Sequence, residues 1–183
     1  MAILYGIKKA VLTELDPSTG KPPTSDGKTV TFKTAEEASL EPVVSEGAEE
    51  IKRNAEQILA VVREDDLLYG YNITLKDNEF TADVAGLVAG YTVTGEDDSQ
   101  TISTPMMSEG KMSKPFKLEL YIANYSGDSV VNYCKVTFNK CEGSFPSMNF
   151  GKEFMAPEFS IKARENTKAS LPIKSISFVT TLA

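Results

Sequence analysis

The amino-acid sequence predicts a mainly β protein, a sandwich or barrel of antiparallel strands with one short flanking α-helix. Three observations lead to this fold class. Apolar and polar residues alternate along most of the chain, clusters of Gly, Pro and Asn separate the alternating segments, and a short apolar stretch near the middle fits a helix. The 183 residues are expected to form one domain, residues 1–183, because this length suffices to bury a hydrophobic core.

Two strands are expected near the N-terminus. Residues 7–15 (IKKAVLTEL) and 28–33 (KTVTFK) both alternate in polarity, which is typical of half-buried strands. The stretch DPSTGKPPTSDG lies between them, and its Pro and Gly residues interrupt regular structure. We therefore expect a turn-rich loop over residues 16–28.

The segment EGAEEIKRNAEQILAVVRED, residues 46–65, allows two interpretations. Apolar residues recur at helical spacing along it, which favours an amphipathic helix. Its last part, ILAVV, suits a buried strand equally well, and Arg53-Asn54 suits a turn. The local pattern leaves this choice open.

The stretch EFTADVAGLVAGY, residues 79–91, predicts a short helix packed on a sheet. Asn78 or Thr81 can cap its start and Gly90 can end it. A helix of about ten residues is ~15 Å long, half a bilayer, so the G-x-x-x-G from Gly86 to Gly90 is no membrane dimer motif. It also lacks the Lys-Ser/Thr of a phosphate loop. The expected packing stripe is Phe80, Val84, Leu87, Val88 and Tyr91.

Four further strands are expected in the C-terminal half. FKLELYIAN, YCKVTFN, EFSIKAR and SISFVTTL all alternate with a period of two. The residues expected on their apolar faces are Phe116, Leu118, Leu120 and Ile122, then Cys134, Val136 and Phe138, then Phe159 and Ile161, and finally Ile176, Phe178 and Leu182.

The two cysteines, Cys134 and Cys141, lie in one expected strand. Seven strand residues separate them by about 23 Å, and an odd separation puts them on opposite faces. A disulfide needs Cα atoms within about 7 Å, so we expect two free thiols.

Residues 95–115, GEDDSQTISTPMMSEGKMSKP, are expected to form a long polar loop. It contains Met106, Met107 and Met112, whose adaptable side chains suit a contact with another protein. A loop with incidental methionines is an equally good interpretation. Loops of this length are uncommon and tend to be either functional or disordered.

Composition excludes several classes of function. The chain has no histidine, which removes the commonest general base, the commonest zinc ligand and all His-activated nucleophiles. Its net charge of −7 disfavours a grip on nucleic-acid phosphates. No signal peptide and no apolar run of bilayer length are recognisable. We therefore predict no enzyme, no catalytic, cofactor-binding or metal-binding residues, no cofactor and no membrane contact.

Acidic residues concentrate in residues 36–66, which hold ten acids and three bases and so account for the whole net charge. A solvated face is the simple interpretation. The functional interpretation is a surface that repels an anion. A cation site is a third possibility, although the carboxylates lack the spacing of a calcium loop.

Two blocks of sequence resemble the major tail protein (tail tube) family of bacteriophages and phage-derived tail particles. The first is LLYGYNITLKDNEFTADVAGLVAGYTV, a strand, short helix, Gly and strand. The second runs from YCKVTFNKC through APEF and KAREN to SISFV. Together they cover about Ile58 to Val179, and neither contains a catalytic signature. The resemblance implies a β-sandwich in which residues 46–66 form two strands with a turn near Asn54, and we adopt this over the local helical pattern.

The resemblance also implies a function. Subunits of this family form hexameric rings that stack into a tube, which first contains a tape-measure protein and then conducts DNA without binding it specifically. The expected location is the virion tail, assembled in the cytoplasm of the bacterial host. An acidic lumen would offer DNA no cation contacts. The lumen-facing candidates are Glu49, Glu50, Asp65 and Asp66.

Contacts between stacked rings are expected from the loops at 16–28 and 95–115, with Met106, Met107 and Met112, and from both termini. Two alternatives remain. One is another ring-forming component, such as a tail terminator, a baseplate ring or a secretion-system tube. The other is a stand-alone carbohydrate-binding or adhesin sandwich, which the absence of Trp and the scattered tyrosines disfavour.

Overall fold

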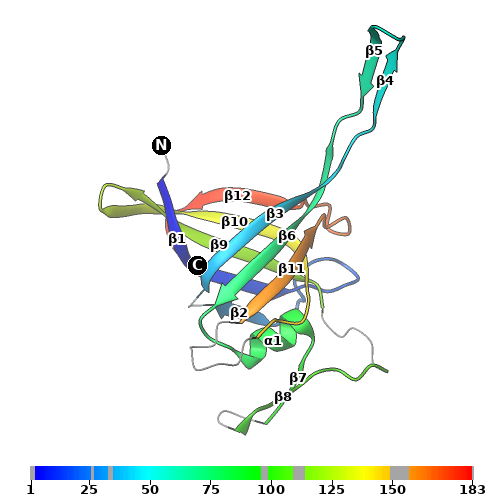
Figure 1. Ribbon diagram of the computed structural model, residues 1–183. Helices are drawn as coiled ribbons and strands as arrows, with labels where there is room; N and C mark the ends of the chain where they lie inside the picture. The colour runs from blue at the N-terminus through cyan, green and yellow to red at the C-terminus, as the bar shows by residue number, and fades with distance from the viewer. Residues whose placement is uncertain are drawn as a thin grey trace.

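A computed structural model describes residues 3–25, 27–32, 35–95, 99–108, 114–148 and 157–182. Within them lie twelve strands and one helix, so the protein is mainly β (Figure 1). The elements are β1 (Ile3–Glu14), β2 (Thr29–Phe32), β3 (Ala35–Ser45), β4 (Glu49–Arg53), β5 (Ile58–Arg63), β6 (Leu67–Asp77), α1 (Ala82–Ala89), β7 (Thr92–Thr94), β8 (Thr101–Ser103), β9 (Phe116–Ser126), β10 (Ser129–Gly143), β11 (Glu158–Arg164) and β12 (Lys174–Val179).

One antiparallel sheet of eight strands forms the body, in the order β2-β1-β9-β10-β11-β6-β3, with β12 also paired to β10. The long strand β10 joins two layers. One of its edges pairs with β9, whereas the other pairs first with β12, over Tyr133 to Phe138, and then with β11, from Cys141 to Gly143. The layers diverge at that point and enclose the core (Figure 1). The predicted antiparallel sandwich is confirmed.

The alternating residues of the C-terminal half behave largely as predicted. Phe116, Leu118 and Leu120 of β9 are buried, and Phe159 and Ile161 of β11 face them from the other layer. Ile122 is only half-buried at the end of this row. The last row is different: Ile176 and Phe178 of β12 are exposed, and Leu182 lies beyond the strand.

The cysteines are free, as predicted, but the prediction of opposite faces was wrong. Both side chains are buried in the core. The pairing of β10 with β9 shifts by one position between Phe138 and Cys141, which is the signature of a β-bulge. The extra residue returns Cys141 to the core side. Burial raises the pKa of both thiols, so they lack the lowered pKa of reactive cysteines.

Helix α1 is shorter and more deeply buried than the predicted stripe. Val84, Leu87 and Val88 are buried as expected, and so are three alanines of the helix. Phe80 and Tyr91 lie outside the helix and are half-buried. Gly90 ends the helix with a φ of 73°, and its N–H donates to the carbonyl of Gly86. Helix α1 is therefore embedded in the end of the sandwich and is not amphipathic.

The backbone of α1 lies against β10 at Gly143. A Cβ atom there would come within 2.3 Å of Val88 Cγ1 and 2.4 Å of the Val88 carbonyl oxygen. Only glycine allows this approach, so Gly143 sets the distance between helix and strand. At Gly86 the nearest atom to an added Cβ would be a carbonyl oxygen at 3.4 Å, an ordinary contact.

These two glycines lead to opposite expectations for the same substitution. We expect Gly143→Ala to lower the free energy of unfolding by about 1–3 kcal/mol, because helix and strand must separate. We expect Gly86→Ala to raise it by about 0.5–1 kcal/mol, because alanine suits a helix interior. Urea denaturation of the two variants measures both effects, and a destabilised Gly86→Ala variant would contradict this description of the helix.

Residues 95–115 are not one continuous loop, because β8 lies within them and pairs with β7. The β7–β8 hairpin projects beside α1, at the end of the body opposite to β4 and β5 (Figure 1). Among the described residues, no helix is long and apolar enough to cross a membrane.

Candidate assembly surfaces

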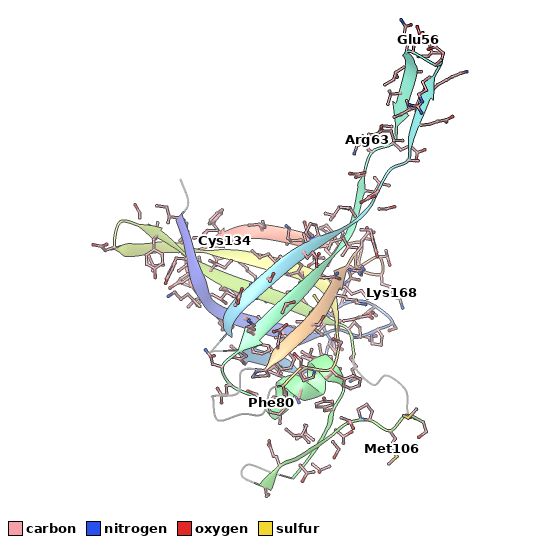
Figure 2. The ribbon with its side chains drawn as sticks, in the orientation of Figure 1. Glu56, Arg63, Phe80, Met106, Cys134 and Lys168 are labelled. Carbon is pink, nitrogen blue, oxygen red and sulfur yellow. The ribbon has the colours of Figure 1, made fainter. Side chains whose placement is uncertain are left out.

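Residues 46–66 form a projecting hairpin, called the arm below. Strands β4 and β5 pair antiparallel, with Ile51 opposite Val61, so the adopted prediction of two strands is confirmed and the local helical pattern is wrong. The arm continues outward from β3 and β6 and stands away from the body (Figures 1 and 2).

The base of the arm is held by short backbone contacts. The N–H of Glu64 donates to the Ala48 carbonyl at 2.9 Å, and the N–H of Gly47 donates to Asp66 Oδ1 at 3.0 Å. A Cβ atom on Gly47 would lie 2.0 Å from the Glu64 carbonyl oxygen. The two backbone segments at the base of the arm can therefore approach this closely only because residue 47 is glycine. Arg63 pairs with Asp66 at 3.8 Å.

The tip of the arm is a defined turn centred on Asn54. Its N–H donates to the Gln57 carbonyl at 3.0 Å, and its Oδ1 accepts from the N–H groups of Glu56 and Gln57 at 3.1 and 2.7 Å. The turn predicted near Asn54 is confirmed. These bonds explain how a hairpin without a core keeps its register, since asparagine favours such turns.

The arm exposes an unusual amount of apolar surface. Every residue of β4 and β5 is exposed, including Ile58 at 64% and Leu59 at 58%. Ile51 and Val61 share one face of the hairpin, because they lie opposite each other in the pairing. A lone two-stranded hairpin is marginally stable in water. An apolar, uncovered hairpin therefore indicates a surface that another protein covers.

The four acidic candidates all lie on the arm or at its base. Glu49 and Glu50 are successive residues of β4 and therefore point to opposite faces, while Asp65 and Asp66 follow β5. Asp66 is engaged with Gly47 and Arg63 and thus has a structural role. The arrangement is an acidic arm and not an acidic sheet face, and the lumen assignment stays a prediction.

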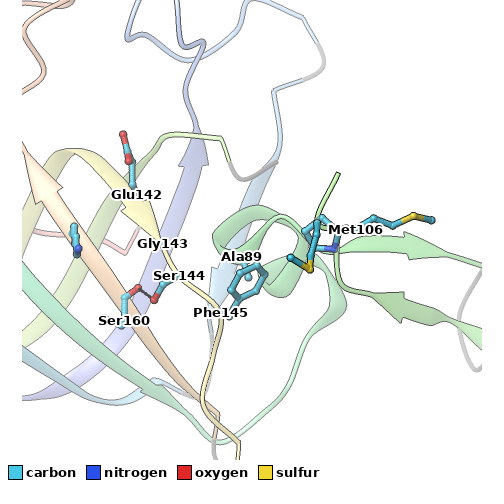
Figure 3. Close-up of a pocket in the computed structure, with 10 residues that line it drawn as sticks. Ala89, Met106, Glu142, Gly143, Ser144, Phe145 and Ser160 are labelled. Atoms are coloured by element: carbon cyan, nitrogen blue, oxygen red, sulfur yellow. Dashed lines mark hydrogen bonds between the residues drawn. The ribbon is translucent and has the colours of Figure 1, made fainter. Parts of the chain in front are cut away.

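A cavity of about 540 Å³, drawn in Figure 3, lies beside Met106 at the end of the molecule opposite to the arm (Figure 2). It is called the Met cavity below. Its apolar lining consists of Ala89, Pro105, Met106, Met107, Gly143 and Phe145. The two methionines and Phe145 are exposed, and Phe145 stacks on Tyr91 with ring centroids 5.7 Å apart. Met112, the third predicted methionine, lies outside the described residues.

The polar residues of the Met cavity lie on β10, β11 and the segment that follows β10. Glu142 and Lys162 contribute opposite charges, and the Ser144 hydroxyl donates to the Ser160 carbonyl at 3.1 Å. The structure thus brings Met106 and Met107 to the C-terminal end of α1. Sequence pattern could not identify Phe145 as their neighbour, because Phe145 lies nearly 40 positions away in an irregular segment.

The sandwich also has open edges. Among the described strands, β3 pairs with β6 alone, β12 with β10 alone and β2 with β1 alone. Ile176 and Phe178 of β12 lie opposite Val136 and Cys134, which are buried, yet they are themselves 57% and 54% exposed. Their side chains lie on the same face of the sheet as the core residues, but in a part of that face that the second layer does not cover. An apolar edge of this kind is a site for pairing with another chain.

The loop at 16–28, predicted to be an assembly arm, is fastened to the body in its first half. The Asn166 side chain donates to the Gly20 carbonyl at 2.7 Å and to the Asn139 carbonyl at 3.2 Å. Lys168 Nζ donates to the Pro17 carbonyl at 2.6 Å. The role of this loop in assembly stays a prediction, and these contacts leave its first half little freedom to reach a neighbour.

The outer face of the β9 layer carries an ion-pair cluster. Glu119 is 9% exposed, and its carboxylate forms ion pairs with Lys135 Nζ at 2.7 Å and with Lys117 Nζ at 3.2 Å. Burial by itself would raise the pKa of Glu119, but the two lysines outweigh it and lower the pKa below its ordinary value of 4.5. The cluster therefore stabilises the folded state only while Glu119 is ionised.

This cluster predicts a pH-dependent effect of Glu119→Gln. Because the folded-state pKa of Glu119 is lowered, its contribution is fully present above the ordinary value of 4.5 and is lost as the pH falls through the folded-state pKa. We expect the variant to unfold at lower urea than the wild type at pH 7, and the difference to shrink on acidification below pH 4.5. A difference of equal size at pH 7 and pH 3 would contradict the ion-pair account.

No group of three or more His, Cys, Asp or Glu residues in the described part of the chain is placed to hold a metal ion. The features that remain are therefore surfaces: the arm, the Met cavity and the open edges. The chain matches no protein-family model, and no curated protein is similar to it in sequence.

Proposed function

We propose that this chain is the structural subunit of a phage-type tail tube. It assembles into hexameric rings that stack, and the lumen of the stack conducts DNA during ejection. Its partners are copies of itself, a tape-measure protein and other tail proteins, and its location is the virion tail.

The observation that carries the proposal is the arm. The family resemblance implied two strands and a turn over residues 46–66, where the local pattern favoured a helix, and the chain has the two strands. A correct expectation against the local pattern supports the resemblance more than the general sandwich does, because many unrelated proteins are sandwiches.

The open edges support self-assembly for a separate reason. A ring needs two different surfaces on each subunit, so that each copy binds the next in the same way. Strands β3 and β12 provide unpaired backbone groups in different layers of the sandwich, and β12 adds the exposed Ile176 and Phe178. Pairing between neighbours would satisfy these groups and join the sheets of successive subunits.

Electron microscopy of the purified protein over a concentration series tests the proposal. We expect rings and stacked tubes roughly 100 Å wide, a size consistent with a few domains of this length around a central hole. Rings that never stack would favour a tail terminator or baseplate ring. A protein that remains monomeric at every concentration would overturn the proposal, and glycan binding by that monomer would favour the adhesin alternative.

A further inference from the structure

The Met cavity has two chemically different halves. One half, at β10, β11 and the segment after β10, carries the polar residues Glu142, Ser144 and Ser160 (Figure 3). The other half lies at the end of α1, where the apolar residues Ala89 and Phe145 lie together (Figure 3). A cavity with one polar and one apolar half suits an amphiphile, a molecule with a polar head and an apolar tail.

The polar half contains a lysine whose charge no described residue neutralises. Lys162 lies directly opposite Glu142 in the pairing of β11 with β10, yet the Glu142 carboxylate forms an ion pair with Lys140, at 3.7 Å. On its other side Lys162 lies opposite the uncharged Asn72 of β6. Two lysines and one glutamate leave one positive charge at this half. The ammonium group of Lys162 therefore favours a head group that is negatively charged.

The apolar half combines a fixed floor with adaptable walls. Ala89 is buried at the end of α1, and the ring of Phe145 is held in a stack on Tyr91, with centroids 5.7 Å apart. Met106 and Met107 form the exposed wall, and methionine side chains adjust to the shape of an apolar group at little cost. A volume of about 540 Å³ lies within the roughly 300–1,000 Å³ of small-molecule sites. These features fit a flexible aliphatic chain.

We propose that the Met cavity binds a free single-chain amphiphile with an aliphatic tail and a carboxylate head, of which a medium-chain fatty acid is the simplest. The tail lies over Ala89, between Phe145 and the two methionines, and the carboxylate lies at Lys162 Nζ. Every residue of this site belongs to one copy of the chain. Binding therefore needs no assembly, and the site is independent of the proposed tube function.

Isothermal titration calorimetry of the dilute protein tests the tail. The ligands are hexanoate, octanoate and decanoate, each kept below the concentration at which it forms micelles. We expect one ligand per chain. Each buried CH₂ group contributes about fourfold in affinity, so each step of two CH₂ groups is expected to tighten binding about 15-fold.

Two substitutions test the two halves of the cavity, with decanol as the uncharged analogue of decanoate. We expect Phe145→Ala to weaken the binding of both ligands about tenfold, because the tail loses the ring on which it packs. We expect Lys162→Gln to weaken decanoate about 2–5-fold and to leave decanol unchanged. Lys8→Gln, which removes an exposed lysine of β1 outside the cavity, is the matched control and should bind decanoate as the wild type does. All three positions are exposed, and circular dichroism checks that the variants fold.

Several results would overturn the site. No binding at any chain length, an affinity that does not depend on chain length, or unchanged binding by Phe145→Ala would each show that the cavity does not hold the tail. More than one ligand per chain would mean adsorption to exposed apolar surfaces such as the arm. Equal weakening by Lys8→Gln and Lys162→Gln, or loss of decanol with Lys162→Gln, would show that Lys162 does not hold the carboxylate.

Discussion

Protein carrying Ile58→Thr and Leu59→Thr is expected to form single rings and no tubes. Threonine keeps the strand propensity of β5 and replaces the apolar groups that the arm exposes, which are expected to contact a neighbouring copy in the proposed tube. Burying the exposed part of each side chain contributes about 1–1.5 kcal/mol, so the double substitution is expected to weaken each contact that the arm makes with another copy by roughly 30–150-fold. In the proposed hexameric ring the contacts of all subunits lose this amount together, which is expected to prevent stacking at concentrations where wild-type tubes form.

Sedimentation and micrographs at matched concentrations measure this effect. The monomer of the variant should unfold at the same temperature as the wild type, because the arm contributes no residue to the core. Val130→Thr with Val131→Thr is the matched control, since these valines are exposed strand residues at the end of another hairpin. Normal tubes from the arm variant, or equal loss of tubes in the control, would refute the role of the arm.

Lysine at two positions of β12 is expected to prevent formation of the ring, which precedes the stacking of rings into a tube. Ile176→Lys with Phe178→Lys places two charges on the apolar edge, and charged residues on an edge prevent pairing with another strand. We expect a folded monomer that forms neither rings nor tubes. Light scattering gives the mass, and circular dichroism checks that the strands remain.

The same strand provides the control for this experiment. Ser175 and Ser177 alternate with the apolar pair and lie on the outer face, so Ser175→Lys with Ser177→Lys adds the same charge on the other side of β12. We expect this variant to retain rings. If both double variants form rings, β12 is not the lateral contact. If both fail, the backbone edge matters and the apolar face does not.

Local sequence pattern predicted the strands of the body well, because burial of alternate residues follows from a period of two. Phe116, Leu118 and Phe159 lie in the core as that pattern requires. It failed at Cys141, where a single extra residue in β10 reverses which side chains face the core. A bulge leaves almost no trace in polarity, so the pattern alone cannot place it.

The arm shows a different limit. Residues 46–65 have helical spacing, yet they form a hairpin, because the strands on either side continue outward and the chain must return at Asn54. Spacing reports which residues share a face only if that face is buried within the same chain. Here no face is buried, so the pattern carries no information on the local fold. The same holds for Ile176 and Phe178, whose exposure depends on where the second layer ends.

The candidate surfaces were predictable in part. Met106 and Met107 were predicted to be contact residues from their position in a polar segment; they line a cavity, and their contact with another protein stays a prediction. Phe145 was not, because its partners come from distant segments. The acidic residues were recognised as a group, but their spread over both faces of a projecting hairpin required the fold.

The pairing of β1 with β9 has a consequence for the order of events during synthesis. Glu14 pairs with Phe116, about 100 positions later, so at 5–20 residues per second the edge of β1 that pairs with β9 stays open for roughly 5–20 s, although β2 follows β1 closely on its other edge. The arm is a local hairpin that closes within about 1–10 μs of its emergence. The Met cavity includes Ser160 and Lys162 of β11 in its lining, so it forms only after that strand has emerged. A nascent chain can therefore present a finished apolar arm to other molecules for seconds before its own body has folded.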